Sequence, residues 1–269
     1  MRDEAALPRP PRVYGAVNWL GAWTLFVKEV RRFLKVYFQT ILAPVATTLL
    51  FLAVFALSVG RMAAQVNGVP FLEFLAPGLI MMAMVQNAFA NTSSSIIISK
   101  VQGNIVDMLM PPLTAAEQTL ALALGGVARG LAVGVAVAAT IEALVPLHAP
   151  HPGYIAYHAA LGSLMLSLLG MIGGIWADKF DHMAAVTNFL VTPLSFLSGT
   201  FYSIDRLPQS VQAIAFANPF FYMIDGFRYG FVGRADGPVG MGLLVVAIVD
   251  LVLLATTWRM LDTGYKLKA

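Results

Sequence analysis

Six stretches of mostly apolar residues, each about 20 residues long, constrain this chain more than any other feature of its sequence. A helix of that length spans the hydrocarbon core of a bilayer, and only short connections separate the stretches. Hydrophobic residues make up 58% of the chain and charged residues 12%, whereas a soluble domain carries roughly 25% charged residues. The chain is therefore predicted to be an all-α integral membrane protein, with no segment left for a soluble catalytic domain.

The predicted transmembrane helices are bounded by charges, prolines and turn residues. In chain order they cover residues 40–59, 74–99, 115–145, 154–177, 183–197 and 239–260. Ahead of them, apolar residues recur at steps of three and four over residues 18–38, with basic residues between, which is typical of an amphipathic interfacial helix. We therefore divide the chain into a cytoplasmic arm with this helix, residues 1–38, and a transmembrane domain, residues 39–269.

Lys and Arg residues outside the predicted spans are concentrated on one side of the membrane. Most lie in the N-terminal arm and helix, in the connections at Lys100 and Lys179, and at the C-terminus from Arg259 onward. Because basic residues accumulate on the cytoplasmic side, both termini are predicted to be cytoplasmic. That orientation requires an even number of spans, and the six apolar stretches satisfy it.

The segment between the fifth and sixth spans is too apolar for a surface loop and too interrupted for one spanning helix. Its polar and helix-breaking residues are Asp205, Arg206, Pro208, Asn218, Pro219, Asp225 and Arg228. Irregular backbone survives at membrane depth only where protein or water satisfies its amide groups. We therefore predict an external re-entrant helical hairpin, in which Asp225 and Arg228 lie close enough to pair.

The second span carries polar side chains inside an otherwise apolar helix. They are Gln86, Asn87, Asn91, Ser94 and Ser95, and all but Gln86 fall on one face by helical spacing. This face could line a translocation route. Polar residues in spans more often bond one helix to another, and we favour that interpretation.

Two charged residues, Arg129 in the third span and Asp250 in the sixth, lie far from the ends of their helices. At about 1.5 Å per residue, both fall roughly 14 to 18 Å from the cytoplasmic interface. A lone charge at the centre of a span costs a few kcal/mol, so two opposite charges at matching depth are predicted to form an ion pair. The alternative is that each faces its own aqueous cavity or a subunit interface.

Several stretches of the chain resemble ABC-2 type transporter permeases. FLSGTFYSIDRLP, followed by NPFFYMIDGFRYG, is similar to the C-terminal signature of that family, and residues 74–95 and 100–117 extend the resemblance over most of the chain. The resemblance implies an export permease of the bacterial cytoplasmic (inner) membrane, working as a homodimer with two copies of a separate ATPase subunit. It leaves the substrate open between lipid-linked glycans, lipids and small amphipathic compounds such as drugs.

The resemblance also implies which residues contact the ATPase. The cytoplasmic segment after the second span corresponds to the family's coupling element, and the interfacial helix is implied to touch the same subunit. The residues concerned are Lys28, Arg31, Arg32, Lys35, Val101, Gly103, Asn104, Asp107, Met108 and Leu109. The alternatives are a simple lipid anchor for the helix and a plain connector for the segment. Thr114 and Glu117 form a capping box that begins the next helix.

The sequence contains no recognisable catalytic or metal-binding motif. It has no GxxxxGK[ST], GxSxG, HExxH or CxxC pattern and no cysteine. We therefore predict no catalytic residue, metal site or cofactor in this chain, with ATP and Mg bound by the partner ATPase. The basic residues that flank the spans orient the protein in the membrane, and they do not form a nucleic-acid footprint. The expected partner of the spans is therefore membrane lipid. The alternative function is a membrane-embedded enzyme or scaffold that uses the intramembrane charges.

Overall fold

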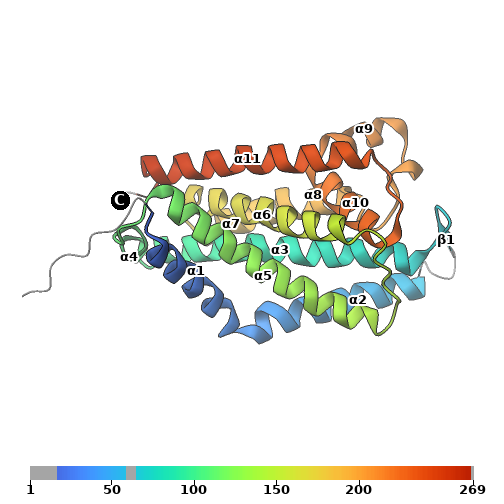
Figure 1. Ribbon diagram of the computed structural model, residues 1–269, viewed down its shortest axis with the longest axis horizontal. Coiled ribbons are helices and arrows are strands. Elements are labelled where there is room, and N and C mark those ends of the chain that lie inside the picture. The colour runs from blue at the N-terminus through green and yellow to red at the C-terminus, as the bar shows by residue number, and fades with distance from the viewer. Residues whose placement is uncertain (1–16, 59–64, 268–269) are drawn as a thin grey trace, which may run out of the picture.

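The computed structural model describes residues 17–58 and 65–267. Here long helices lie side by side along one axis, with a pair of short strands at one end of the bundle (Figure 1). Five helices are long and apolar enough to cross a membrane, which confirms the all-α membrane class. They are η1–α2 (Phe38–Ser58, beginning with the π-helical turn η1, Phe38–Leu42), α3 (Phe71–Val101), α5 (Ala115–Glu142), α6 (Pro152–Trp176) and α11 (Val239–Thr263).

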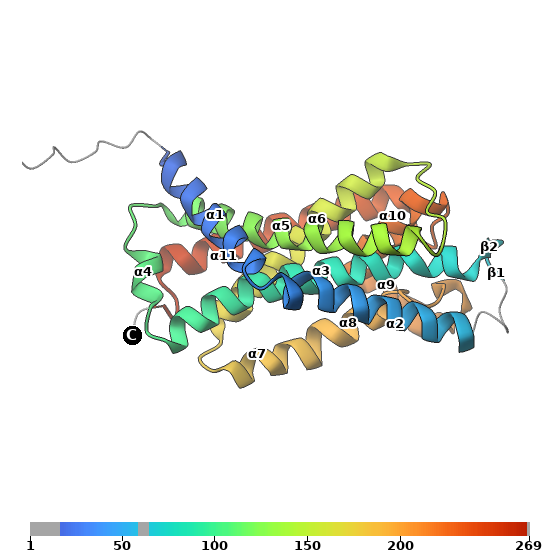
Figure 2. The ribbon, with the colours of Figure 1, turned by 90° about the horizontal axis from the view of Figure 1, so that it is seen from below.

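The predicted fifth span differs from these five helices. It is a composite rod of α7 (Phe180–Val186), the π-helical turn η2 (Thr187–Val191) and α8 (Thr192–Leu197). Asp181, His182 and Asn188 make it less apolar than the five candidate spans. The rod lies on the same side of the bundle as α2, and its α7 part stands away from the other helices (Figure 2). Six spans therefore remain a prediction, of which five have the length and apolarity required.

Shorter elements connect the long helices. They are α1 (Trp19–Leu34), β1 (Gln65–Val66), β2 (Val69–Pro70), α4 (Ile105–Leu109), the 3₁₀ turn η3 (Ile204–Arg206), α9 (Gln209–Ala217) and α10 (Pro219–Val232). β1 and β2 pair antiparallel around Asn67 and Gly68, which both have positive φ, as a tight hairpin turn requires.

Helix α3 lies at the centre of the bundle, packed mainly against α5, α6 and α10. Most of it is buried, whereas α2 and α11 leave most of their apolar surface exposed. Glycines in α5 allow close packing: a Cβ at Gly126 would lie 2.2 Å from Ser167 Oγ, and one at Gly130 would lie 3.0 Å from the carbonyl oxygen of Met84. The small residues of the third span thus let neighbouring helices approach closely.

The segments predicted to be cytoplasmic gather at one end of the bundle, on the left in Figure 1. Lys266 and Lys100 both donate to the Asp178 carboxylate, at 3.1 and 3.4 Å, and so link the end of α11, the end of α3 and the α6–α7 connection. The hydrogen bond from Lys266 lowers the pKa of Asp178 below its ordinary value. Asn18 joins this end as well, because its N–H donates to Glu117 Oε1 at 2.6 Å. The first and last described residues therefore lie at the same end of the bundle.

Helices α9 and α10 form a hairpin toward the opposite end. Its turn is held by Asn218, whose Oδ1 accepts from the Phe220 N–H and whose Nδ2 donates to the carbonyl of Leu194 in α8. Helix α10 ends at Gly233 with φ 71, where the Gly230 carbonyl accepts from the backbone N–H that precedes α6. The hairpin opens toward the β1–β2 end, and its turn lies deeper along the bundle.

Arg228 of α10 is almost completely buried, with 2% of its surface exposed. Its Nε donates to the carbonyl of Phe74 at 3.2 Å, and its Nη2 donates to the carbonyls of Gly199 and Thr200, where α8 has ended. The guanidinium also lies 4.0 Å from the centre of the Phe74 ring. A Cβ at Gly78 would lie 2.6 Å from the Thr200 oxygen, so only glycine permits this approach.

The predicted pair between Asp225 and Arg228 does not form. Asp225 accepts instead from the backbone N–H groups of Asp236 and Gly237, at 2.9 and 3.0 Å, in the connection to α11. The two charges lie one helical turn apart, but they hydrogen-bond to different backbone segments. Arg228 donates to carbonyls of α3 and of the segment after α8, whereas Asp225 accepts from N–H groups of the connection to α11.

We predict that Arg228→Gln lowers the free energy of unfolding by about 3 kcal/mol or more, because several buried carbonyls lose their donor. Unfolding in detergent micelles measures the loss. Arg206→Gln is the matched control, since Arg206 is exposed and, among the described residues, donates to the Gln65 carbonyl alone, at 3.3 Å. Equal stability of the two variants would contradict the assignment.

Candidate functional site

A network of polar side chains fastens α1 to α3. Glu29 has 1% of its surface exposed and accepts from Ser95 Oγ at 2.8 Å and from Arg32 Nη2 at 2.9 Å. The same Arg32 nitrogen donates to the carbonyl of Asn91 at 2.6 Å, and Arg32 Nη1 donates to Ser94 Oγ at 3.2 Å. The network confirms that the polar face of α3 bonds helix to helix at Asn91, Ser94 and Ser95.

This network corrects the expectation that Arg32 belongs with Lys28, Arg31 and Lys35 on the face of α1 that contacts the ATPase. Glu29 and Arg32 face inward because α1 crosses α5 at Gly125, where a Cβ would lie 2.7 Å from Glu29 Cβ. Lys28, Arg31 and Lys35 are exposed, as expected for the outer face, and Trp19 and Trp23 are also exposed. Helical periodicity identified an amphipathic helix but did not separate the charges that pack against α3 from those that do not.

The predicted ion pair between Arg129 and Asp250 is wrong. Arg129 Nη2 donates to Asn87 Oδ1 on α3 at 2.9 Å, while neither carboxylate oxygen of Asp250 has a partner among the described residues. Helix α11 packs more against α6 and α10 than against α5, and Asp250 lies near Tyr157 of α6. Equal depth in the membrane did not imply adjacency.

Two grooves with polar linings flank the outer side of α3. One, of about 300 Å³, lies between η1–α2 and α3; the other, of about 290 Å³, lies between α3 and the α7–α8 rod. Gln86 lines both. Their remaining polar side chains are Gln39, Thr47, Thr48 and Asn87 in the first groove and Ser93, Ser94, Thr187 and Thr192 in the second. Among the described residues that line them, none is acidic.

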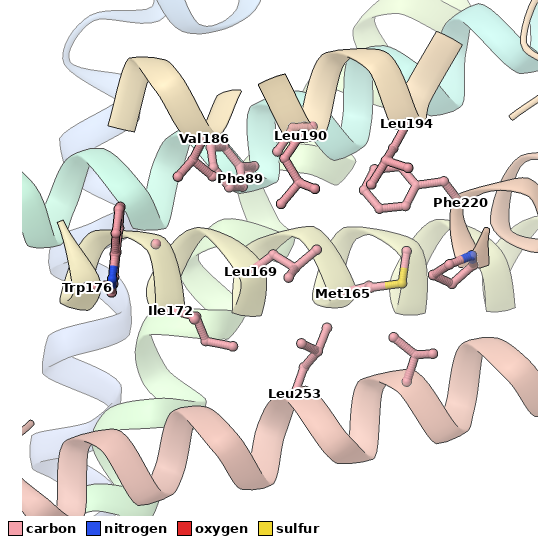
Figure 3. A pocket seen from close by; sticks show the side chains of 14 residues that line it. Phe89, Met165, Leu169, Ile172, Trp176, Val186, Leu190, Leu194, Phe220 and Leu253 are labelled. Atoms are coloured by element: carbon pink, nitrogen blue, oxygen red, sulfur yellow. The ribbon is translucent and has the colours of Figure 1, made fainter. Parts of the chain in front are cut away.

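A third groove, of about 350 Å³, is lined almost entirely by apolar side chains. Figure 3 shows Leu169 and Ile172 of α6 between Leu190 of the rod and Leu253 of α11, with Trp176 at one end. Without polar groups, this groove suits lipid chains and offers nothing to orient a polar ligand.

The short helix α4 presents the predicted coupling residues at the end of the bundle that holds Asp178. Met108 is buried, and Leu109 is half-buried, so these two hold α4 in place. The exposed predicted residues are Val101, Gly103, Asn104 and Asp107. Sequence reasoning missed Val106 and Met110, which are 52% and 76% exposed. Their apolar character was visible in the sequence, but not the direction in which they point.

Beside α4, a groove of about 420 Å³ separates it from α1 and is lined in part by Lys28 and Asp107. The capping box at the start of α5 forms as predicted: Glu117 N–H donates to Thr114 Oγ1, and Thr114 N–H donates to Glu117 Oε2. Glu117 also accepts from Asn18, so α1 is tied to the base of α5.

At the opposite end of the bundle, Asp205, Arg206 and Pro208 are exposed.

Residues 21–232, which run from α1 to α10, match the family described as ABC-2 type transporter. The chain is 36% identical over 253 residues to the Inner membrane transport permease YadH of Escherichia coli strain K12, covering 93% of this chain and 98% of that protein. It is 26% identical over 246 residues to Nodulation protein J of Rhizobium leguminosarum bv. viciae, covering 90% and 93%.

We predict that Glu29→Ala loosens α1, because Arg32 and Ser95 lose their shared acceptor while remaining largely shielded from water. Backbone amide hydrogen exchange across residues 19–34 should accelerate at least about tenfold. Lys28→Ala, which removes an exposed neighbouring charge, is the control and should leave exchange unchanged. If both variants exchange like the parent protein, the network does not hold α1.

Proposed function

The chain belongs to the ABC-2 type transporter family, and we propose that two copies of it form an export pathway driven by separate ATPase subunits. Its family makes it the membrane subunit, or permease, of an ABC transporter, which supports a non-catalytic role for this chain. It is a multi-pass membrane protein. The inner membrane named for the Escherichia coli relative is the membrane we propose for this chain as well.

The observation that carries the ATPase contact is the apolar surface of α4. Val106 and Met110 are exposed at the end of the bundle, beyond the spans, and Lys28 of α1 lies across a groove from their neighbours Asp107 and Met108. Exposed apolar side chains beside charged ones are typical of a protein interface. The ATPase therefore contacts α4 and the outer face of α1 through Lys28, Arg31 and Lys35, and it binds ATP and Mg. Arg32 takes no part, because its guanidinium is committed to α3.

The polar grooves support pairing with a second copy. Gln86 and the threonines of α2 and the rod would face hydrocarbon if α3 were covered by lipid, which is costly for polar groups. A second copy placed against α2 and the rod covers both grooves and encloses a polar route along α3. The polar side chains of α3, which the sequence predicted to bond helix to helix, then form two groups. Asn91 and Ser95 face α1, and Gln86 faces the route.

In this arrangement the α7–α8 rod is the fifth of six spans, and both termini are cytoplasmic. The α9–α10 hairpin enters the membrane from the external side and returns without crossing. The burial of Arg228 and the capping of the Asn218 turn support a re-entrant element, because they supply partners for backbone groups that lipid cannot satisfy.

The topology is tested by cysteine labelling, which is clean here because the chain has no cysteine. Gln209→Cys and Pro238→Cys, both at exposed positions, should react with an impermeant reagent added outside. Asp107→Cys should react only after the cytoplasmic side is opened. Protection of position 209 or 238 from the external reagent would rule out the six-span arrangement with an external hairpin.

The coupling surface is tested by the double change Arg31→Glu and Val106→Asp, which places negative charge on both exposed elements. The amount of ATPase recovered with the permease should fall at least about tenfold, because the interface loses complementarity. Arg206→Glu, a charge reversal at the opposite end, should leave recovery unchanged. Undiminished recovery and stimulated ATPase activity in the double variant would remove α4 and α1 as the contact.

A further inference from the structure

Arg129 lacks a counter-charge in a polar region of the bundle. Glu29 and Arg32 balance each other at 2.9 Å, whereas the one described partner of Arg129 is the neutral Asn87 side chain. The described residues supply no carboxylate in an ion pair with Arg129. Arg32 is near enough to repel it electrostatically. The cluster where α1, α3 and α5 meet therefore carries a net positive charge.

The polar atoms left over in this cluster are hydrogen-bond donors. Arg129 Nε and Asn91 Nδ2 are buried and have no partner among the described residues. The orientation of the Asn91 amide follows from its neighbour, because Asn91 Oδ1 accepts from Arg32 Nη2 at 3.2 Å. A negatively charged acceptor bound here would accept hydrogen bonds from Arg129 Nε and Asn91 Nδ2 and would also balance the charge of Arg129.

The groove between η1–α2 and α3 gives such an acceptor a way in. Asn87, the hydrogen-bond partner of Arg129, lines this groove. Arg129 is partly exposed and lies directly behind Asn87, outside the groove lining, so a ligand in the groove reaches the guanidinium by displacing the Asn87 side chain. Thr47 and Gln86 add hydroxyl and amide donors to the wall, while Phe51, Leu79 and Met82 supply apolar surface. The groove lies between two apolar spans, so the apolar part of a ligand can lie against these apolar side chains.

We propose that the α2–α3 groove binds the phosphate group of an anionic amphiphile, with Arg129 recognising the charge. The planar guanidinium presents several donors in a fixed geometry that matches phosphate oxygens, and the hydroxyl and amide side chains serve the remaining oxygens. The proposal rests on the proposed function in one respect, because it takes this groove to be part of the export route. The transported substrate is then an anionic amphiphile. Binding itself is measurable without transport.

The test measures binding of short-chain lipids to the purified full-length permease in a neutral detergent. Dihexanoyl-phosphatidylglycerol carries a net negative phosphate diester, and dihexanoyl-phosphatidylcholine carries the same diester with a compensating cation. The anionic lipid should bind at least about tenfold more tightly. Inorganic phosphate should bind more weakly than the anionic lipid, which separates a lipid headgroup from free phosphate as the source of the anion.

The variants assign the preference to the groove. Arg129→Gln should abolish the difference between the two lipids, and Arg129→Lys should retain part of it. Arg259→Gln is the control, because it removes an exposed cation from another helix, α11. Thr47→Trp fills the groove from an exposed position, and it should weaken binding of the anionic lipid even if the Arg129 variants fail to fold.

Equal affinity of the parent protein for the two lipids would overturn the proposal. An unchanged preference in Arg129→Gln, or unweakened binding of the anionic lipid in Thr47→Trp, would also overturn it. Inorganic phosphate binding as tightly as the anionic lipid would overturn the amphiphile. Recovery of the ATPase with the permease is measured on the same preparations. Absence of a lipid preference in a preparation that still binds the ATPase would reject this inference and leave the proposed function intact.

Discussion

The architecture depends on satisfying backbone polar groups where helices break inside an apolar bundle. Arg228 does this for the end of α8, donating to the carbonyls of Gly199 and Thr200 while also reaching Phe74 of α3. Asp225 does the reverse on the other side of α10, accepting from two N–H groups of the connection to α11. Helix α10 thus joins α3, the rod and α11, because its buried cation and its buried anion satisfy backbone groups of different segments.

A second polar anchor gives the permease a physical link between α1, which we propose contacts the ATPase, and the core of the bundle. Helix α1 is tied to the base of α5 through Asn18 and to the middle of α3 through Glu29 and Arg32. In the proposed arrangement, force applied by an ATPase to the outer face of α1 reaches α3 directly. Because α3 lines both polar grooves, its displacement would alter the route that we propose those grooves form.

The three intramembrane grooves divide the surface by chemistry. Those beside α3 carry hydroxyl and amide groups, whereas the groove among α6, the rod and α11 is apolar. Lipid covers the apolar groove at no electrostatic cost, but the polar ones need protein, water or a polar ligand. This difference supports placing the second copy on the side that carries α2 and the rod.

The sequence by itself determined the membrane class, five of its six predicted spans, the capping box at Thr114 and Glu117, and the segment that exposes Val106, because apolar length and helical periodicity are local properties. It also located every charge along its helix. Only the tertiary structure decided which helix each charge faces: Arg129 contacts Asn87 and not Asp250, Arg32 turns inward to Asn91, and Asp225 and Arg228 part. Depth follows from counting residues along one helix, but adjacency depends on how helices pack, and glycines such as Gly125 and Gly78 set that packing through contacts with residues distant in the chain.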